Sequence, residues 1–137
     1  MTEQENVQLV KKLFSLFNRG DLERALELFS DEVDFRSPVS EVVNKIPWAK
    51  PRHGREEVAE FFKELIERFE IEPFEINQIV AEKDMVAVEG SNGGRIRVTD
   101  VPYEHNWVMV LSFQGGKISR CWHYYDSADL METSHKD

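Results

Sequence analysis

The side chains best suited to acid–base chemistry lie in the last third of the sequence. The segment Lys117–Tyr125 is rich in strand-forming residues, and strand side chains alternate between two faces, so His123 and Tyr125 share one face. Histidine changes charge near neutral pH, which makes His123 the candidate general acid/base. It would act on a small hydrophobic substrate with a carbonyl or ether-like oxygen, oriented by His105, Tyr125 or Asn92. The alternative is an interior histidine that donates to a backbone carbonyl or to Tyr125.

The same alternation predicts the walls of a pocket. If His105 faces inward, Trp107 and Met109 lie on the same side of their strand. An apolar and aromatic cavity with a few converging polar groups is typical of a small-molecule site. The sequence therefore predicts a small apolar or aromatic ligand. The candidate ligand-binding residues are Asp34, Arg36, Trp48, Asn92, His105, Trp107, Met109 and Tyr125.

Three of these candidates come from outside the C-terminal strands. Asp34 and Arg36 share a face and could form an ion pair at the cavity mouth, although a solvated pair at the rim is the commoner arrangement. Trp48 lies in the irregular stretch Val39–Arg52, which is longer than a simple turn. Long ordered loops often form lids or pocket walls. Trp48 is therefore expected either to cover the pocket or to pack into the core.

Helical periodicity dominates the first half of the chain. Apolar residues recur at helical spacing over 6–19, 21–29 and 55–69, which predicts three amphipathic helices. Gly20 suits the C-terminal cap of the first helix, and Asp21 suits the N-terminal cap of the second. So short a connection predicts that these two helices pack as a hairpin.

Strand patterns follow the helices. Short segments rich in strand-forming residues are separated by turn residues, and a turn is expected at Gly93-Gly94. Helices followed by meandering strands indicate an α+β fold with helices on one face of an antiparallel sheet, in one domain over 1–137. The expected strands are 33–36, 74–80, 85–92, 95–99, 103–113 and 117–125.

Composition excludes several classes of protein. A net charge of −9 with no basic cluster disfavours nucleic-acid binding, because such a surface repels phosphate. No apolar run is long enough to span a bilayer, and the N-terminus lacks the features of a signal peptide, so a cytoplasmic location without membrane association is expected.

Cys121 is the sole cysteine, and it is expected to be a small buried residue rather than a nucleophile. No metal site and no cofactor are expected.

The outward face of the last two strands predicts self-association. Val108, Val110, Trp122 and Tyr124 share the parity opposite to that of the pocket residues. An apolar band of this size is unusual on the surface of a monomer. A two-fold contact between sheets would cover it, so a homodimer through the sheet is expected.

The order of several motifs resembles one known family. The motifs are Arg19-Gly20-Asp21-Leu22, Phe29-Ser30-Asp31-Glu32-Val33-Asp34-Phe35, Pro47-Trp48, His53-Gly54-Arg55-Glu56-Glu57-Val58, Phe61-Phe62, Gly116-Lys117-Ile118 and Tyr124-Tyr125-Asp126-Ser127-Ala128. Together, over about residues 5–131, they resemble a SnoaL-like, ketosteroid-isomerase-related protein of the nuclear transport factor 2-like superfamily. The resemblance implies a cone-shaped fold, in which a strongly curved antiparallel sheet wraps three helices around a pocket at its open end. It also implies a homodimer formed sheet to sheet.

Departures from the family narrow the chemistry that the resemblance implies. Ketosteroid isomerases carry a carboxylate base before the proline that ends the first strand, where this chain has Ser37 before Pro38. Their two oxyanion donors correspond to Leu13 and Met109, neither of which can donate a hydrogen bond to an oxyanion. A typical ketosteroid isomerase mechanism is therefore not expected.

Comparison with two other enzymes of the family leaves His123 as the one candidate for proton transfer. The arginine and two aspartates of limonene-epoxide hydrolases correspond to Gly90, Asn92 and His123. SnoaL-type polyketide cyclases place an acid/base aspartate near the position of His123. The resemblance thus implies that His123 retains a proton-transfer role.

Three functions remain open from the sequence. The chain could be a cofactor-independent isomerase, cyclase, lyase or hydrolase-like enzyme that uses His123. It could instead be a non-catalytic carrier or sensor for an apolar ligand. A third alternative is a structural dimerisation module whose cavity is filled by its own side chains, Trp48, Trp107 and Tyr125 among them.

Overall fold

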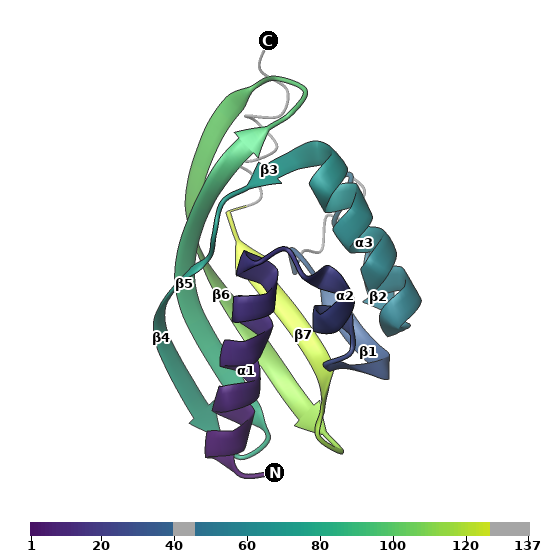
Figure 1. The fold of residues 1–137 in the computed structure, drawn as a ribbon, viewed down its shortest axis with the longest axis vertical. Coiled ribbons are helices and arrows are strands. Elements are labelled where there is room, and N and C mark those ends of the chain that lie inside the picture. Colours follow the sequence, from purple (N-terminus) through teal and green to yellow (C-terminus); the bar gives the residue numbers. More distant parts are fainter. Residues whose placement is uncertain (40–45, 127–137) are drawn as a thin grey trace.

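The computed structural model describes residues 1–39 and 46–126, which form three helices and a strongly curved sheet (Figure 1). The helices are α1 (Glu3–Asn18), α2 (Leu22–Leu26) and α3 (Gly54–Arg68). Helix α1 begins with a capping box, in which the Thr2 hydroxyl accepts from the Glu5 N–H and the Glu5 carboxylate accepts from the Thr2 N–H. The apolar stripe of α1 is buried, as its periodicity predicts.

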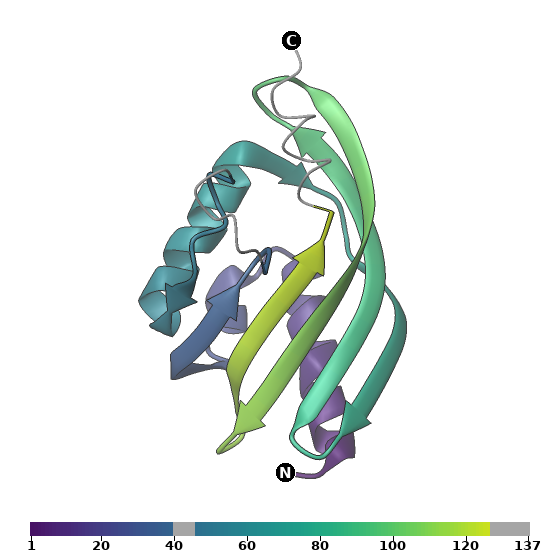
Figure 2. The ribbon, with the colours of Figure 1, turned by 180° about the vertical axis from the view of Figure 1, so that it is seen from behind.

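The strands form one sheet in the order β2-β1-β7-β6-β5-β3, and β4 pairs with the remaining length of β5. Figure 2 shows β1 and β7 side by side and the long, bent β5 and β6 next to them. Their bounds are β1 Phe29–Arg36, β2 Arg52–His53, β3 Phe69–Ile71, β4 Glu75–Glu82, β5 Met85–Ile96, β6 Val101–Gln114 and β7 Lys117–Tyr125.

The sheet is mixed rather than wholly antiparallel. Strand β1 runs parallel to β7, with Arg36 opposite Trp122, whereas the other pairings are antiparallel. Consecutive hairpin turns impose antiparallel pairing on β4 to β7. Strand β1 is joined to β7 through the rest of the chain, so its direction is set by packing instead. This pairing brings the end of β1 beside the end of β7.

The predicted turn at Gly93-Gly94 is wrong. Strand β5 runs through both glycines as one strand, and the chain turns between Ile96 and Val101. A Cβ on Gly94 would collide with the Glu70 carbonyl and the Tyr103 ring, so glycine is needed where β3 and β6 approach β5 closely.

Two helix ends also differ from the sequence prediction. Helix α2 stops at Leu26, so Phe29 begins β1 instead of ending a helix. Helix α3 stops at Arg68, and Phe69 adopts extended backbone angles that start β3. In both places apolar residues continue past the helix end, and periodicity alone does not show where the backbone changes.

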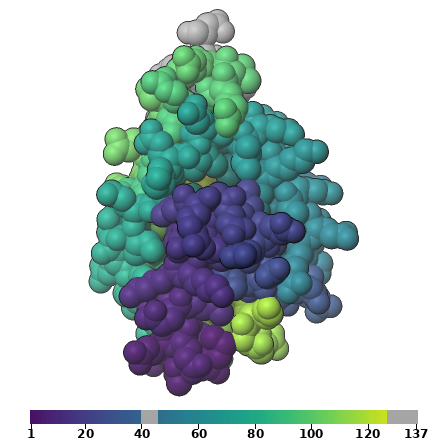
Figure 3. Space-filling model, viewed as in Figure 1, coloured from purple at the N-terminus to yellow at the C-terminus, as the bar shows by residue number. Residues whose placement is uncertain are grey.

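The helices cover the concave side of the sheet (Figure 1), and in the space-filling view the helix hairpin and α3 hide most of that face (Figure 3). The predicted strand parity is confirmed, because Trp107, Met109 and Leu111 are buried while Val108 is exposed. No helix within the described ranges is long and apolar enough to cross a membrane. The fold therefore provides a curved, apolar inner face with helices above it.

Candidate functional site

A cavity of about 350 Å³ lies between the concave face of the sheet, the end of α1, α3 and the segment 69–74. Its walls are mainly aromatic and aliphatic, and its volume falls within the range of ligand pockets. The predicted residues that line it are Asn92, His105, Met109, His123 and Tyr125. The parity of β5, β6 and β7 thus brings together residues that are far apart in sequence.

His123 presents one ring nitrogen to Ser37 and leaves the other without a partner. Its Nδ1 lies 3.0 Å from the Ser37 Oγ, while its Nε2 is buried and has no hydrogen-bond partner among the described residues. Ser37 occupies this position because β1 runs parallel to β7, and the next residues stay close, with the Val39 N–H donating to the His123 carbonyl. One nitrogen of this cavity-lining histidine is therefore uncommitted within the described part of the chain.

The protonation of His123 differs from the near-neutral exchange expected from its sequence position. Burial, reinforced by nearby His105, lowers the pKa of His123 to about 3. The imidazole is consequently neutral at physiological pH, with a single proton on one of its two nitrogens. It can accept or donate a neutral hydrogen bond, but it resists becoming an imidazolium.

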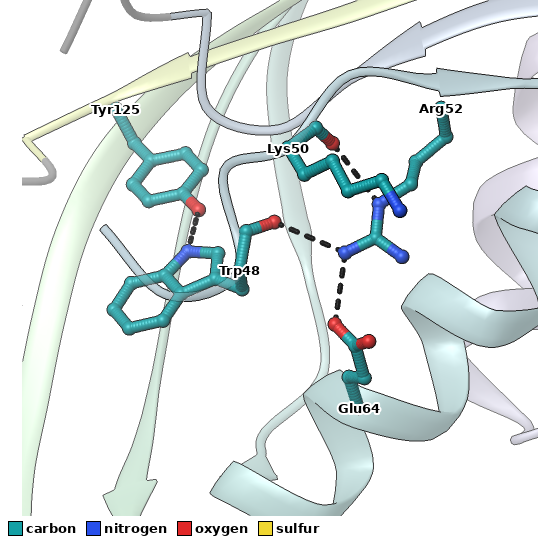
Figure 4. Close-up of polar contacts among 5 residues, drawn as sticks. All are labelled: Trp48, Lys50, Arg52, Glu64 and Tyr125. Carbon is teal, nitrogen blue, oxygen red and sulfur yellow. Dashed lines mark hydrogen bonds and ion pairs between the residues drawn. The ribbon is translucent and has the colours of Figure 1, made fainter. Parts of the chain in front are cut away.

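Tyr125 is tied to the interior by Trp48 (Figure 4). The Trp48 Nε1–H donates to the Tyr125 hydroxyl over 2.7 Å, and the Trp48 ring packs edge-on against Phe69 at 5.1 Å. Burial raises the pKa of Tyr125 well above its ordinary value, and hydrogen bonds from Trp48 and Ser37 offset only part of that effect. Trp48 does not line the cavity itself. It supports Tyr125 and Phe69, which do.

Arg52 fixes the segment that carries Trp48, a role that the sequence did not reveal. The side chain is 2% exposed and donates to the backbone carbonyls of Lys50 and Trp48 and to the Glu64 carboxylate of α3, 2.8 Å away (Figure 4). Arg52 lowers the pKa of Glu64 through this hydrogen bond. The predicted loop Val39–Arg52 is thus anchored at its end, whereas residues 40–45 lie outside the described part of the chain.

Two polar residues accompany the His123–Tyr125 pair. The His105 ring stacks on Tyr125 with 5.2 Å between ring centroids. Asn92 is nearly buried and donates weakly to the Glu72 carbonyl over 3.5 Å, while its Oδ1 accepts from no described residue. Both side chains line the cavity.

Trp107 packs one layer behind the cavity instead of lining it. It stacks on Phe14 at 5.3 Å and meets the His123 ring edge-on at 5.4 Å. A Cβ on Gly90 would collide with the Trp107 ring, so the glycine makes room for the indole. Trp107 therefore holds the His123 ring in position.

Asp34 and Arg36 do not lie at the cavity mouth. They form the expected ion pair, 3.5 Å between Arg36 Nε and Asp34 Oδ1, but on the opposite face of β1. There the Arg36 guanidinium lies over Trp122, 4.4 Å from the ring centroid. Phe35, between them in sequence, is the residue of this strand that faces the cavity.

Sequence reasoning also missed residues that shape the cavity. Ser37 was noted only as a substitute for a family carboxylate, yet it lines the cavity and touches His123. Tyr103 also lines it, and burial, with Glu72 nearby, raises the pKa of Tyr103 to about 12. Much of the remaining wall comes from the aromatic residues Phe17, Phe35, Phe61, Phe62, Phe69 and Phe74. In the described ranges no three metal-ligating side chains come together.

Solved structures share this architecture. A nuclear transport factor 2-like protein from Burkholderia xenovorans is 27% identical, with a TM-score of 0.84 over 98% of this chain and 99% of that one. A putative polyketide cyclase from Xanthomonas campestris is 18% identical, with a TM-score of 0.77 over 96% and 98%. TerC, crystallised with polyporic acid, is 16% identical, with a TM-score of 0.83 over 96% and 99%.

No curated protein matches the chain. The SnoaL-like domain family, in contrast, matches residues 10–121, which is most of the sequence. The three helices, the curled sheet and the inward site agree with that assignment. This chain is therefore a member of the SnoaL-like family, within the nuclear transport factor 2-like superfamily.

Proposed function

We propose that the cavity binds a small, uncharged molecule with an apolar or aromatic body, and that His123 exchanges a proton with it in a cofactor-independent isomerisation or cyclisation. The observation that carries the proposal is the buried, unpartnered Nε2 of His123 beside a cavity of about 350 Å³. An unpaired buried polar atom is costly unless a ligand completes its hydrogen bonding. The likeness to a putative polyketide cyclase and to TerC, which was crystallised with polyporic acid, supports a small-molecule ligand.

The charge of the ligand follows from the cavity wall. Aromatic rings make up much of the lining, and His123 is neutral because burial lowers its pKa to about 3. Glu70, Glu72 and Arg97 also line the cavity, but His123 itself offers no charge to a ligand. Burying an ion against a neutral group is far more costly than burying a neutral oxygen that accepts a hydrogen bond. A neutral carbonyl or ether-like oxygen therefore suits the site.

A thermal-unfolding panel tests the proposal. Wild type and His123→Ala are heated with small steroids, terpenoid epoxides, aromatic ketones and fatty acids, and Val98→Ala, an exposed turn substitution, serves as the control. One neutral class is expected to raise the melting temperature of wild type and control, because a ligand that binds only the folded state stabilises it. Failure of every class to shift wild type would overturn ligand binding at this cavity.

A non-catalytic carrier is the second candidate function. The observation favouring it is the strongly lowered pKa of His123, since a base that resists protonation is a weak one. The class that raises the melting temperature is then assayed for conversion by chromatography. Conversion by wild type supports the enzyme, and unchanged ligand recovered from both wild type and His123→Ala supports the carrier. A module with a filled cavity is less compatible with the space that remains beside Tyr125.

We also propose that the chain forms a homodimer through the convex face of the sheet. Val108 and Tyr124 are paired across β6 and β7 and are each 38% exposed. Val110 and Trp122 are paired next to them, so the four side chains form one apolar band, here called the outer band. A second copy related by a two-fold axis would place outer band on outer band.

A further inference from the structure

Two short strands share one edge of β5 and leave a gap between them (Figure 1). Strand β3 pairs with β5 as far as Gly94, and β4 resumes the pairing at Ser91. The connecting residues 72–74 belong to neither strand. A second hollow, of about 600 Å³, opens here between the segment 72–75, residues 91–94 of β5 and residues 102–104 of β6. It is called the acidic hollow, and His123 does not line it.

The rim of the acidic hollow carries negative charge without a counter-charge. Glu72, Glu75 and Glu104 line it and are exposed. Among the residues that the structure describes, none of these carboxylates forms an ion pair, and no lysine, arginine or histidine lines the hollow. Arg95, the next cation along β5, instead donates to the carbonyl and the carboxylate of Asp100 over 3.1 and 3.4 Å. Carboxylates gathered in this way attract a cation from solution.

Asn92 adds a buried acceptor that also lacks a partner. It lines the acidic hollow and is 8% exposed, so little of it reaches solvent. Its Nδ2 donates weakly to the Glu72 carbonyl over 3.5 Å, whereas its Oδ1 is buried and accepts from no described residue. A buried carbonyl oxygen without a donor is costly. Asn92 therefore points to a ligand that donates hydrogen bonds, independently of the charge on the rim.

The floor of the hollow admits a thin, partly apolar chain. A Cβ on Gly93 would come within 2.8 Å of the Tyr103 carbonyl and 3.5 Å of the Glu72 Oε2, so the glycine keeps the space beside that carboxylate open. Pro73 and Pro102 also line the hollow and present ring methylenes. The hollow thus combines hydrogen-bond acceptors with apolar contact for the methylenes of a cationic chain.

The acceptors are spread over the hollow instead of converging on one point. In the described part of the chain, no three acidic, histidine or cysteine side chains are grouped so that they could hold a metal ion. A methylene chain with ammonium groups at intervals can meet separated carboxylates, and each terminal ammonium donates up to three hydrogen bonds.

We propose that the acidic hollow binds an aliphatic polyamine. Its ammonium groups lie at the three glutamates and at the Asn92 Oδ1, and its methylenes lie against the two prolines. This site is separate from the chemistry proposed for His123 and does not depend on it.

Nitrogen-15 NMR of the full chain, titrated with spermidine, locates and measures the binding. The ionic strength is held constant, so that screening of the surface charges does not change during the titration. Amides in 72–75, 91–94 and 102–104 are expected to shift together and to saturate, with a Kd of about 1 mM for a few exposed ion pairs. The amides of Met109 and His123, which line the cavity and not the hollow, are expected to stay in place.

Variants of the rim separate this site from general attraction to an acidic protein. Glu75→Gln combined with Glu104→Gln removes two exposed charges and is expected to weaken binding by about 10-fold, or about threefold for each ion pair. Glu23→Gln combined with Glu60→Gln is the matched control, because both residues are exposed and lie on α2 and α3, away from the hollow. Asn92→Leu removes the buried acceptor and is also expected to weaken binding by about 10-fold.

Two further ligands test the preference for a long cation. n-Butylamine has a similar methylene chain with one ammonium group, and it is expected to bind about 10-fold more weakly than spermidine because it meets fewer carboxylates. Mg²⁺ is expected to bind more weakly than spermidine, because the acceptors do not converge on one ion.

Four results would overturn the proposal. Equal weakening by the rim variant and the control would show attraction to the acidic surface as a whole. Shifts centred on Met109 and His123 would place the amine in the cavity. Tighter binding of Mg²⁺ at the same amides would identify a site for an inorganic cation. No saturating shift up to about 10 mM spermidine, ten times the expected Kd, would show that the hollow takes no polyamine.

Discussion

At the scale of single residues, the environment of His123 matters more than its residue type. A ring nitrogen beside Ser37, a second nitrogen without a described partner and a Trp107 ring edge together define what this histidine can do. Strand alternation places the histidine on the cavity side of β7, and the packing then shields its Nε2 from water. The result is a group suited to neutral hydrogen bonding.

The lowered pKa of His123 predicts a loss of stability in mild acid. Unfolded His123 takes up a proton below about pH 6.5, whereas folded His123 remains neutral until the pH approaches about 3. Its contribution is therefore intact above pH 6.5 and falls by up to about 1.4 kcal/mol per pH unit between those values. Urea unfolding from pH 7 to 5 should show a steeper loss for wild type than for His123→Asn.

The same substitution at His53, which is exposed at the start of α3, is the control for loss of a histidine. Parallel pH curves for wild type and His123→Asn would contradict a buried neutral imidazole.

At the scale of elements, one arginine joins an irregular segment to a helix. Arg52 bonds two carbonyls in 46–52 and the Glu64 carboxylate on α3, and Trp48 then reaches Tyr125 from the segment that Arg52 holds. The guanidinium can make these contacts together because its donors are arranged as a rigid fork. The back wall of the cavity thus depends on a side chain outside its lining.

Replacing Arg52 should loosen that wall. Arg52→Ala leaves buried carbonyls without donors and is expected to lower the free energy of unfolding by about 3 kcal/mol, whereas Arg52→Lys keeps one charged contact and loses less. Urea unfolding measures the difference. Arg24→Ala is the matched control, because the Arg24 side chain is 72% exposed in its ion pair with Asp21. Equal losses for Arg52→Ala and Arg24→Ala would contradict an anchoring role.

Sequence patterns predicted the helices and strands that have strong periodicity. They did not predict features that depend on packing between distant parts of the chain. Alternation placed His105, Met109, His123 and Tyr125 on the inner face, and the structure confirms it. Alternation along β1 also puts the buried apolar residues Val33 and Phe35 on the inner face. Asp34 and Arg36 should then have been predicted on the outer face, where they lie.

Other features left no signal in the sequence. The strand through Gly93-Gly94 depends on the close approach of two neighbouring strands, which turn propensity does not record. The Ser37–His123 contact depends on the parallel pairing of β1 with β7, and the Arg52 anchor joins a loop to a helix. Such contacts follow from the assembled fold, so residue type and spacing do not predict them.

At the scale of the whole molecule, the curved sheet has two different faces. Its concave face holds the cavity beneath the helices, and its convex face is seen in Figure 2. On that face the outer band lies beside the guanidinium groups of Arg36 and Arg120, which both stack on Trp122. Strands β6 and β7 contribute to both faces, so any contact on the convex side rests on the strands that carry His105 and His123.

The proposed dimer predicts a particle of twice the 16.0 kDa mass of one chain. Tyr124→Glu places a charge in the outer band and is expected to shift sedimentation equilibrium toward the monomer, because a buried unpaired charge is costly. Val98→Glu is the control, since Val98 is 89% exposed in the β5–β6 turn. A wild-type particle of one-chain mass at micromolar concentration would contradict the dimer.

The three tryptophans lie in different surroundings, so each can serve as an intrinsic fluorescent probe of its own part of the protein. Trp48 touches the Tyr125 hydroxyl, Trp107 meets the His123 ring, and Trp122 lies against Arg36 and Arg120 on the convex face. Indole emission responds to local polarity and charge, so each ring would report a different event. Variants that retain a single tryptophan would then allow fluorescence to follow loop anchoring, cavity occupancy and sheet-to-sheet contact separately.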